Sequence, residues 1–438
     1  MSKAIARAPA AGRAAAALGH VARAARRLLS PRRILATAAF LGGLVSRIRR
    51  RRAEARLTVA VDINSQYETL TGVGWYLHEL LLHLADRDDL RLRLYGQGLV
   101  DAPGAPRPVV PLPAGKAIEA VTYSALDGLV IPPWRAEQWL RRAAPLLVAA
   151  DRNRVLFAPN YLPPPLFRLA SGARVATIHD LAVRRLPWAV RPDSARALAE
   201  GLERTLVEAE LLLTPSAAVR DELVAAGVAP ARVRAIHHGP GQRTHPGDPP
   251  PRTPPRFGLH VGTLEPRKNV PMLLAAWRLL RRRLPGAPPL VLAGASGWHA
   301  EALRREVGQA EDEGWLVYLG YVSPAELAAL YCRAAVVVVP SLYEGFGLPA
   351  VEALAAGAPL VASDIPPLRE VAGDAAVYAP PERPEVWADR LAEVLSNDEL
   401  RRELAGRAAA RRGMFDWERA AEATARAWRD AAEAGQAG

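Results

Sequence analysis

The chain has 438 residues, half of them hydrophobic, which is too long for one ordinary core and sufficient for two. Its formal charge of +12 resides in residues 1–56, which hold fourteen of the 57 lysines and arginines and one acid, Glu54. Beyond residue 56, 43 basic residues are balanced by 44 acidic ones. A nucleic-acid-binding body is therefore not expected, because such a body would carry a basic surface.

Hydropathy and cysteine content indicate the compartment in which the protein is expected. The longest apolar run, residues 34–45, is shorter than the roughly eighteen residues that a membrane-spanning helix needs. The single cysteine, Cys332, excludes a disulfide within the chain and fits a reducing compartment. We expect a cytoplasmic protein that lies on the inner face of the membrane if its N-terminal extension binds there.

The extension, residues 1–56, has two interpretations that the sequence leaves open. Arginines flank its apolar middle, which is typical of a peripheral anchor on an anionic membrane, where each cation contributes about 1 kcal/mol. The same Ala- and Arg-rich composition also fits a disordered tail. A secretion signal is a poor match, because the positive region is too long and no convincing cleavage site follows.

From Leu57 onward, short apolar runs alternate with amphipathic stretches, which predicts α/β domains with parallel sheets. We place two α/β domains at residues 57–240 and 256–413, separated by a linker at 241–255 that is rich in Pro, Gly and His. Residues 414–438 form a final helical segment that either caps the second domain or crosses back to the first. Strands are predicted at residues 57–61, 174–178, 211–213, 258–261, 290–293 and 336–339.

Two segments of the first domain follow predicted strands. Gly72-Val73-Gly74 precedes a helix that we expect to begin near Trp75, so the amide of Gly74 could meet a phosphate. The third glycine of a dinucleotide fingerprint is missing, which makes this signal weak alone. His179 ends a strand at the crevice side, although a lone histidine is more often structural. The triplet Asp86 to Asp88 resembles a metal-binding Asp-x-Asp, but no third ligand lies nearby in sequence, so no metal is predicted.

The second domain opens with a strand followed by G-T-L-E-P-R-K-N from Gly262. Arg267 and Lys268 then lie at the carboxyl end of that strand, where open parallel sheets bind ligands. Arg267 offers a fork of donors and Lys268 a point charge, which together suit a diphosphate. A solvated helix N-terminus is the alternative. Cations there oppose the helix dipole, however, so this placement favours a bound anion.

The most informative segment is residues 344–352, E-G-F-G-L-P-A-V-E, which follows a predicted strand. Two glycines let the backbone approach a ligand, Pro349 suits the first turn of a helix, and Gly357 would end it. Glu344 is expected in the loop and Glu352 in the first helical turn, one facing a hexose and the other a ribose. The alternative is a solvated acid and a helix-capping acid.

These motifs resemble those of glycosyltransferase family 4, whose members are retaining enzymes with the B-type fold of two facing Rossmann-like domains. The resemblance covers nearly all of residues 62–417. Its parts here are G-V-G-W-Y at Gly72, H-D at His179, G-T-L-E-P-R-K-N at Gly262, P-S-L-Y-E-G-F-G-L-P-A-V-E-A at Pro340 and F-D-W-E at Phe415.

The resemblance implies roles for individual residues. Catalysis would use His179, Arg267, Lys268 and Glu344, with the departing phosphate helping to deprotonate the acceptor. Neither a metal nor another cofactor is implied. The donor nucleotide-sugar would contact Gly74, Gly262, Arg267, Lys268, Glu344, Gly345, Phe346, Gly347, Leu348 and Glu352.

The motifs look most like those of bacterial mannosyl- or rhamnosyltransferases of O-antigen and exopolysaccharide assembly. GDP-mannose is therefore the first donor expected, with a glycan or lipid-linked acceptor. Trp75 departs from the Arg that such relatives often carry, which leaves the acceptor open. Two other functions compete: a sugar-nucleotide epimerase of the same architecture, and a catalytically silent scaffold that binds nucleotide-sugar.

Overall fold

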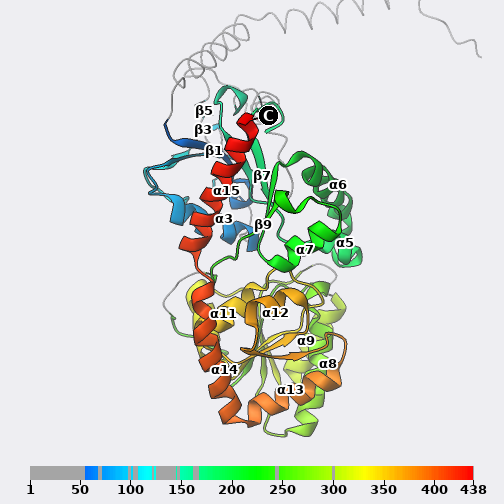
Figure 1. Cartoon of the computed structure of the whole chain (residues 1–438). Coiled ribbons are helices and arrows are strands. Elements are labelled where there is room, and N and C mark those ends of the chain that lie inside the picture. Colours follow the sequence, from blue (N-terminus) through cyan, green and yellow to red (C-terminus); the bar gives the residue numbers. More distant parts are fainter. Residues whose placement is uncertain are drawn as a thin grey trace, which may run out of the picture.

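The computed structural model describes residues 55–67, 72–96, 100–101, 107–120, 123–124, 145, 148–160, 167–241, 246–297 and 301–437. These residues form two α/β domains, one above the other in Figure 1, with the N-terminal domain uppermost. The predicted fold class, α/β with two facing Rossmann-like domains, is confirmed. The N-terminal extension, except for its last two residues, lies outside the described residues, so the anchor hypothesis stays a prediction.

The N-terminal domain contains a parallel sheet in the order β4-β2-β1-β6-β7-β8-β9. Its strands are β1 (Leu57–Asp62), β2 (Leu90–Tyr95), β4 (Ile118–Ala120), β6 (Val155–Ala158), β7 (Ala173–Thr177), β8 (Leu211–Thr214) and β9 (Val233–Ala235), and β3 (Val100–Asp101) pairs separately with β5 (Tyr123–Ser124). Its helices are η1 (Asn64–Gln66), α3 (Gly72–Leu84), α5 (Ala182–Arg185), η3 (Pro187–Ala189), α6 (Pro192–Glu208), α7 (Ala217–Ala225) and η4 (Pro230–Arg232).

The C-terminal domain contains a second parallel sheet in the order β12-β11-β10-β13-β14-β15. Its strands are β10 (Gly258–Val261), β11 (Leu290–Ala293), β12 (Leu316–Gly320), β13 (Val336–Val339), β14 (Leu360–Ser363) and β15 (Ala376–Ala379). Its helices are η5 (Pro266–Lys268), α8 (Val270–Arg283), α9 (Glu301–Asp312), α10 (Pro324–Arg333), α11 (Leu348–Ala356), α12 (Pro366–Ala372), α13 (Pro384–Ser396), α14 (Asp398–Arg411) and η6 (Arg412–Met414).

Helices cover both faces of each sheet, which explains why strands such as β8, β11 and β13 are continuous apolar runs, whereas β2 (L-R-L-R-L-Y) alternates. In the N-terminal domain, α3 packs on one face and α5 to α7 on the other. In the C-terminal domain, α8, α9 and α13 cover one face, while α10, α11 and α12 cover the opposite face. Both sheets therefore present their carboxyl ends, rather than their faces, to ligands.

The last helix, α15 (Trp417–Ala437), follows the C-terminal domain in sequence but packs in the N-terminal core. Figure 1 shows it running up along the N-terminal domain, whereas α14 stays on the lower domain. Trp417 and Trp428 are fully buried with α3 and β1, and Trp417 Nε1 donates to the carbonyl of Pro240 at 2.7 Å. The chain thus crosses between the domains twice.

The predicted strands coincide with observed ones to within one residue at either end. Helix α3 differs: it begins at Gly72 instead of near Trp75, with Gln66 Nε2 donating to the carbonyl of Gly74 at 2.8 Å. Strands β12, β14 and β15, of four or five residues each, were not among the predicted strands. Within the described part of the chain, no helix is long and apolar enough to cross a bilayer.

Candidate active site

A sharp strand-to-helix turn carries the candidate site in the C-terminal domain. Strand β13 ends before Pro340, and α11 begins after Gly347, whose φ of 93° lies in the left-handed region that favours glycine. A Cβ at Gly347 would also fall 2.5 Å from Leu368 Cδ2. Gly357, at φ 69°, ends the helix as predicted. A side chain at position 347 would therefore be strained and would clash with Leu368, so this turn requires glycine.

Glu344 lies in that loop, buried and bound by three donors. It accepts from Lys268 Nζ at 2.6 Å, Arg267 Nη1 at 2.8 Å and Ser341 Oγ at 2.7 Å. Burial alone would raise the pKa of Glu344, but Lys268 and Arg267 lower it to about 2. The alternative of a solvated loop acid is wrong, since only 5% of Glu344 is exposed.

A second carboxylate balances the charges around Arg267. Glu265 Oε1 accepts from Arg267 Nη2 at 2.7 Å, so two cations face two carboxylates. We call Glu265, Arg267, Lys268, Ser341 and Glu344 the charged cluster. The expectation that the cations require a bound anion needs correction, because the chain itself supplies it. Lysine has three N–H donors and arginine five, so both retain donors for a phosphate oxygen.

Glu352 has a different environment. It lies in the second turn of α11, not in the first turn as predicted, because α11 begins at Leu348. Its Oε2 accepts from Tyr331 Oη at 2.6 Å, and a Cβ on Gly241 would fall 1.9 Å from its Oε1. Desolvation raises the pKa of Glu352 to about 7, although Tyr331 and Lys268 oppose the rise. This carboxyl is therefore close to balance between its two protonation states at neutral pH.

The N-terminal domain contributes a histidine and aromatic rings. His179 Nε2 lies 2.7 Å from the carbonyl of Pro159, so Nε2 donates and Nδ1 is left as an acceptor. Burial lowers the pKa of His179, which favours the neutral ring. Tyr76, from α3, packs edge-on against His179 at 4.9 Å between centroids and stacks with His238 at 4.4 Å. The sequence analysis did not single out Tyr76 or His238.

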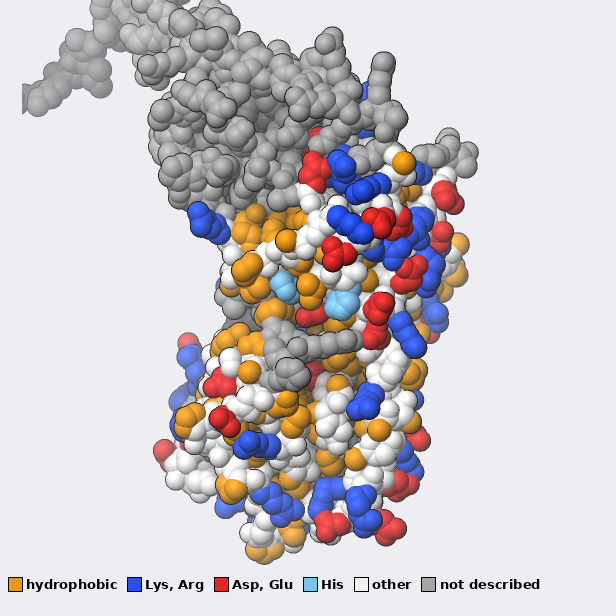
Figure 2. All heavy atoms as spheres, turned by 90° about the vertical axis from the view of Figure 1, so that its left-hand side faces the viewer, with side chains coloured by type: hydrophobic (Ala, Val, Ile, Leu, Met, Phe, Trp, Pro, Cys, Tyr) orange, Lys and Arg blue, Asp and Glu red, His pale blue; other side chains and the backbone are white. Residues whose placement is uncertain are grey.

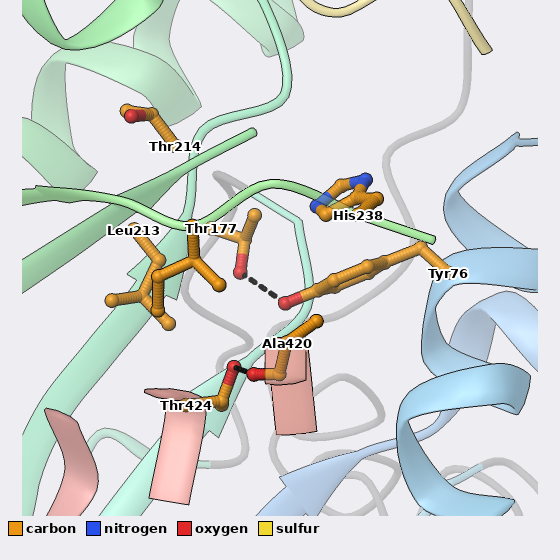
Figure 3. Close-up of a pocket in the computed structure, with 8 residues that line it drawn as sticks. Tyr76, Thr177, Leu213, Thr214, His238, Ala420 and Thr424 are labelled. Carbon is orange, nitrogen blue, oxygen red and sulfur yellow. Dashed lines mark hydrogen bonds between the residues drawn. The ribbon is translucent and has the colours of Figure 1, made fainter. Parts of the chain in front are cut away.

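Figure 3 shows the narrow cavity beneath these rings. The hydroxyl of Tyr76 points at Thr177 Oγ1, 3.0 Å away, and the ring of His238 lies over Tyr76. Thr424 of α15 lines the same cavity, with its hydroxyl donating to the carbonyl of Ala420. The hydroxyls of Tyr76, Thr177, Thr214 and Thr424 all have hydrogen-bond partners within the protein. We therefore interpret the cavity as a support for the rings and not as a ligand site in itself.

The two domains meet at the loop of residues 344–347, which we call the glycine loop. A Cβ on Gly345 would lie 1.7 Å from the carbonyl oxygen of His179, so only glycine permits this approach. Tyr343 Oη accepts from the amide of Leu181 at 3.0 Å, again across the domains. In Figure 2, pale blue histidine side chains lie on the upper domain, above its junction with the lower one. The structure thus brings His179 next to the segment that contains Glu344.

The remaining predicted donor contacts lie around the same edge. Gly262 follows β10, and a Cβ there would touch the aliphatic stem of Lys268 at 3.5 Å. Phe346 is buried, and its ring is stacked with His237 at 5.8 Å. Leu348 begins α11, with its Cδ1 3.8 Å from a Cβ on Gly72. Gly74 is the third residue of α3, so its amide has no acceptor within the helix.

Besides Tyr76 and His238, three residues of the site were not predicted from the sequence as functional candidates. Ser341 and Glu265 lie inside the quoted motifs, and their polar side chains next to strand ends were available signals. Tyr331 lies in α10 at the end of an ordinary amphipathic pattern, and nothing in the sequence indicates its contact with Glu352. Across the part of the chain that the structure describes, no three His, Cys, Asp or Glu side chains are grouped to hold a metal.

Two parallel-sheet domains that face each other across a carboxylate- and cation-lined edge form the B-type fold of glycosyltransferases. The family described as Glycosyl transferases group 1 matches residues 242–411, and the one described as Glycosyltransferase Family 4 matches residues 70–239. The chain belongs to glycosyltransferase family 4.

Individual relatives agree with this assignment. An O-antigen chain mannosyltransferase B of Escherichia coli is 31% identical over 374 residues, covering 82% of this chain and 96% of the relative. A serotype-specific mannosyltransferase of Escherichia coli is 29% identical over 290 residues, which are 65% of this chain and 32% of the relative. The structure of sucrose-phosphate synthase from Thermosynechococcus elongatus has a TM-score of 0.64 at 21% identity, covering 86% and 99% of the chains, and supports the fold.

Proposed function

We propose that the protein transfers mannose, with retention and without a metal, from GDP-mannose to a growing surface polysaccharide or its lipid-linked precursor. The observation that carries the proposal is the 31% identity over 96% of an O-antigen chain mannosyltransferase. The charged cluster and Glu352 supply the chemistry for a nucleotide-sugar. An epimerase or a silent scaffold is less well supported, since these relatives carry the name of transferases.

In the proposed reaction the bond between the anomeric carbon and the diphosphate breaks, and the acceptor oxygen bonds to that carbon. The acceptor proton passes to the departing phosphate. Arg267 and Lys268 stabilise the negative charge that develops on the leaving group. Glu344 holds both cations in place through contacts of 2.6–2.8 Å. Neutral His179, with Nδ1 as an acceptor, suits a sugar hydroxyl.

Thermal unfolding with GDP, UDP, dTDP and ADP tests the donor assignment. A ligand at a hundred times its Kd stabilises by about 2.7 kcal/mol, which is a readily visible shift. Selective stabilisation by GDP, followed by transfer of radiolabelled mannose to a polysaccharide primer without added metal, is expected. Selectivity for UDP or dTDP would replace mannose with another sugar, and no shift would refute the donor site.

Substitutions separate binding from catalysis at this site. Glu352→Ala should raise the donor KM strongly, because ribose hydroxyls lose their acceptor. Replacing Arg267 and Lys268 together should also lower kcat, by about a hundredfold or more, because charge in the transition state is then unopposed. Wild-type kinetics in the double variant would refute the assignment.

The proposed acceptor suggests a membrane role for residues 1–56, with the enzyme on the cytoplasmic face. Fourteen cations and one acid in this extension suit an anionic bilayer. Deletion of residues 1–56 should then abolish sedimentation with anionic vesicles and leave transfer to a soluble primer intact. Unchanged sedimentation of the truncated protein would reject the anchor.

A further inference from the structure

Helix α12 of the C-terminal domain lies against the glycine loop of the candidate site. Its Leu368 lies next to Gly347, where an added Cβ would come within 2.5 Å of Leu368 Cδ2. Its end is fixed by Arg411 of α14, which donates to the carbonyls of Glu370 and Val371 at 2.7 and 3.0 Å. The backbone of Glu370 is therefore anchored to the C-terminal domain.

The side chain of Glu370 reaches the other domain. Its carboxylate accepts from the amides of Ala217 and Ala218 at 2.7 and 2.9 Å, and from His237 Nε2 at 2.6 Å. Burial opposes ionisation, but these three donors lower the pKa of Glu370 below its usual value. Amides in the first turn of a helix have no acceptor within it, so Glu370 caps a helix of the opposite domain.

The same two segments of the N-terminal domain also contact the predicted donor-binding residues. Ser216, which caps α7, donates through Oγ to the carbonyl of Gly345 at 2.6 Å. The ring of His237 stacks with Phe346. Strands β7 and β8 are neighbours, with the amide of Ile178 donating to Leu213 at 2.8 Å. The start of α7, after β8, is thereby tied to the position of His179, after β7.

We propose that Glu370 is a positioning residue of the transferase. It fixes the N-terminal domain, and with it His179, against the glycine loop. Glu370 touches neither of the carboxylates assigned to the donor, and it acts through α7 and His237. Loss of the Glu370 carboxylate should therefore impair the chemical step. Nucleotide binding, which we assign to the C-terminal domain, should remain almost unchanged. The proposal rests on the glycosyltransferase activity and, for its kinetic test, on the mannosyl donor proposed above.

The test uses the full chain with three variants. Glu370→Ala removes the carboxylate, Glu370→Gln retains one acceptor oxygen, and Ala217→Pro removes one donor. Proline is tolerated at the first position of a helix, and Ser216 already has the extended backbone that precedes proline, so α7 should persist. Asn397→Ala is the control, because Asn397 caps α14 within the C-terminal domain by accepting from Leu400.

We expect Glu370→Ala to lower kcat about ten- to a hundredfold, because small displacements of reacting groups are costly. The Kd for GDP should change less than about threefold, and Glu370→Gln should recover part of the loss. Ala217→Pro should add nothing to Glu370→Ala, because the N–H that proline removes has already lost its acceptor in that variant. Asn397→Ala should lower the unfolding temperature and leave kcat unchanged. Additive losses, or a kcat of Glu370→Ala equal to that of the control, would overturn the proposal.

Amide hydrogen exchange tests the contact without any substrate. Protection at Ala217 and Ala218 depends on Glu370 alone, since neither amide has an acceptor within α7. Exchange there should accelerate in Glu370→Ala and stay at the wild-type rate in Asn397→Ala. Equal exchange in Glu370→Ala and wild type would refute the contact. Absence of mannose transfer by the wild type, with accelerated exchange in the variant, would refute only the proposed donor.

Discussion

Glu344 of the charged cluster and Glu352 of the Tyr331–Glu352 pair lie at opposite ends of one short segment, and their pKa values are shifted in opposite directions. Glu344 has three donors, two of them cations, and a pKa of about 2. Glu352 has one neutral donor and a pKa of about 7. Desolvation raises the pKa of both carboxyls, although Glu344 is buried and Glu352 only partly so, and the different partners therefore decide the charge. The cluster is charged before a ligand arrives, whereas Glu352 is poised to ionise when hydroxyl donors reach it.

The largest effect is expected from Glu344→Ala, which breaks the cluster. Lys268 would be left buried without a carboxylate, and removal of one partner of a buried pair costs about 3–5 kcal/mol. Urea unfolding followed by tryptophan fluorescence measures the loss. Glu265→Ala is the matched control, with a smaller expected loss because Arg267 retains Glu344. Equal losses in the two variants would show that Glu344 has no special place in the cluster.

Glu352→Gln should raise the free energy of unfolding at neutral pH, whereas most substitutions lower it. In the wild type the folded state holds the proton of Glu352 up to pH 7, while the unfolded chain releases it near pH 4.5. Stability is therefore lost as the pH rises from 4.5 to 7, by roughly 3 kcal/mol. Glutamine does not titrate, so the stability of the variant relative to the wild type should increase as the pH rises from 4.5 to 7.

The same titration predicts the pH dependence of donor binding. Ribose hydroxyls require the ionised carboxylate, so the wild-type donor KM should fall as the pH rises through about 7. Unfolding temperatures and KM values measured from pH 5 to 8 check both effects. Parallel curves for wild type and Glu352→Gln would contradict the raised pKa and remove the contrast with Glu344.

Arg267→Lys keeps the charge of the cluster and removes the forked pair of donors that reaches two carboxylates. Arg267 bridges Glu265 and Glu344 through separate nitrogens, which a lysine cannot do. We expect kcat to fall about tenfold, equivalent to about 1.4 kcal/mol, with a small change in stability. Arg283→Lys, at the exposed pair with Asp389, should behave as wild type. A normal kcat in Arg267→Lys would mean that charge alone matters.

The smallest effect on stability is expected from Gly241→Ala, beside Glu352. The new Cβ would meet Oε1 of Glu352, the mobile end of its side chain, so stability should change by less than about 1 kcal/mol. The displaced carboxyl should nevertheless raise the donor KM about three- to tenfold, the equivalent of one hydrogen bond. Gly406→Ala, where added atoms meet open space, is the control. Equal KM values would place the ribose elsewhere.

Local chemistry made the fold class and much of the site predictable from sequence. Apolar runs bounded by glycine or proline identified the principal strands, and Gly347 and Pro349 marked the turn before α11. The charge state of Glu344 was not predictable, because it depends on Arg267 and Lys268, which are distant in sequence. For the same reason the contacts of Tyr331 and Glu370 appear only in three dimensions. Periodicity describes one element at a time, and these contacts join several.

The position of α15 determines when the N-terminal domain can finish folding. Trp417 and Trp428 complete its core, yet they are synthesised only after the whole C-terminal domain. During translation the apolar surface of the N-terminal domain that α15 covers stays exposed while the C-terminal domain is synthesised. The first domain to be synthesised is therefore the last to be completed, which reverses the N-terminal-first order usual for multidomain chains.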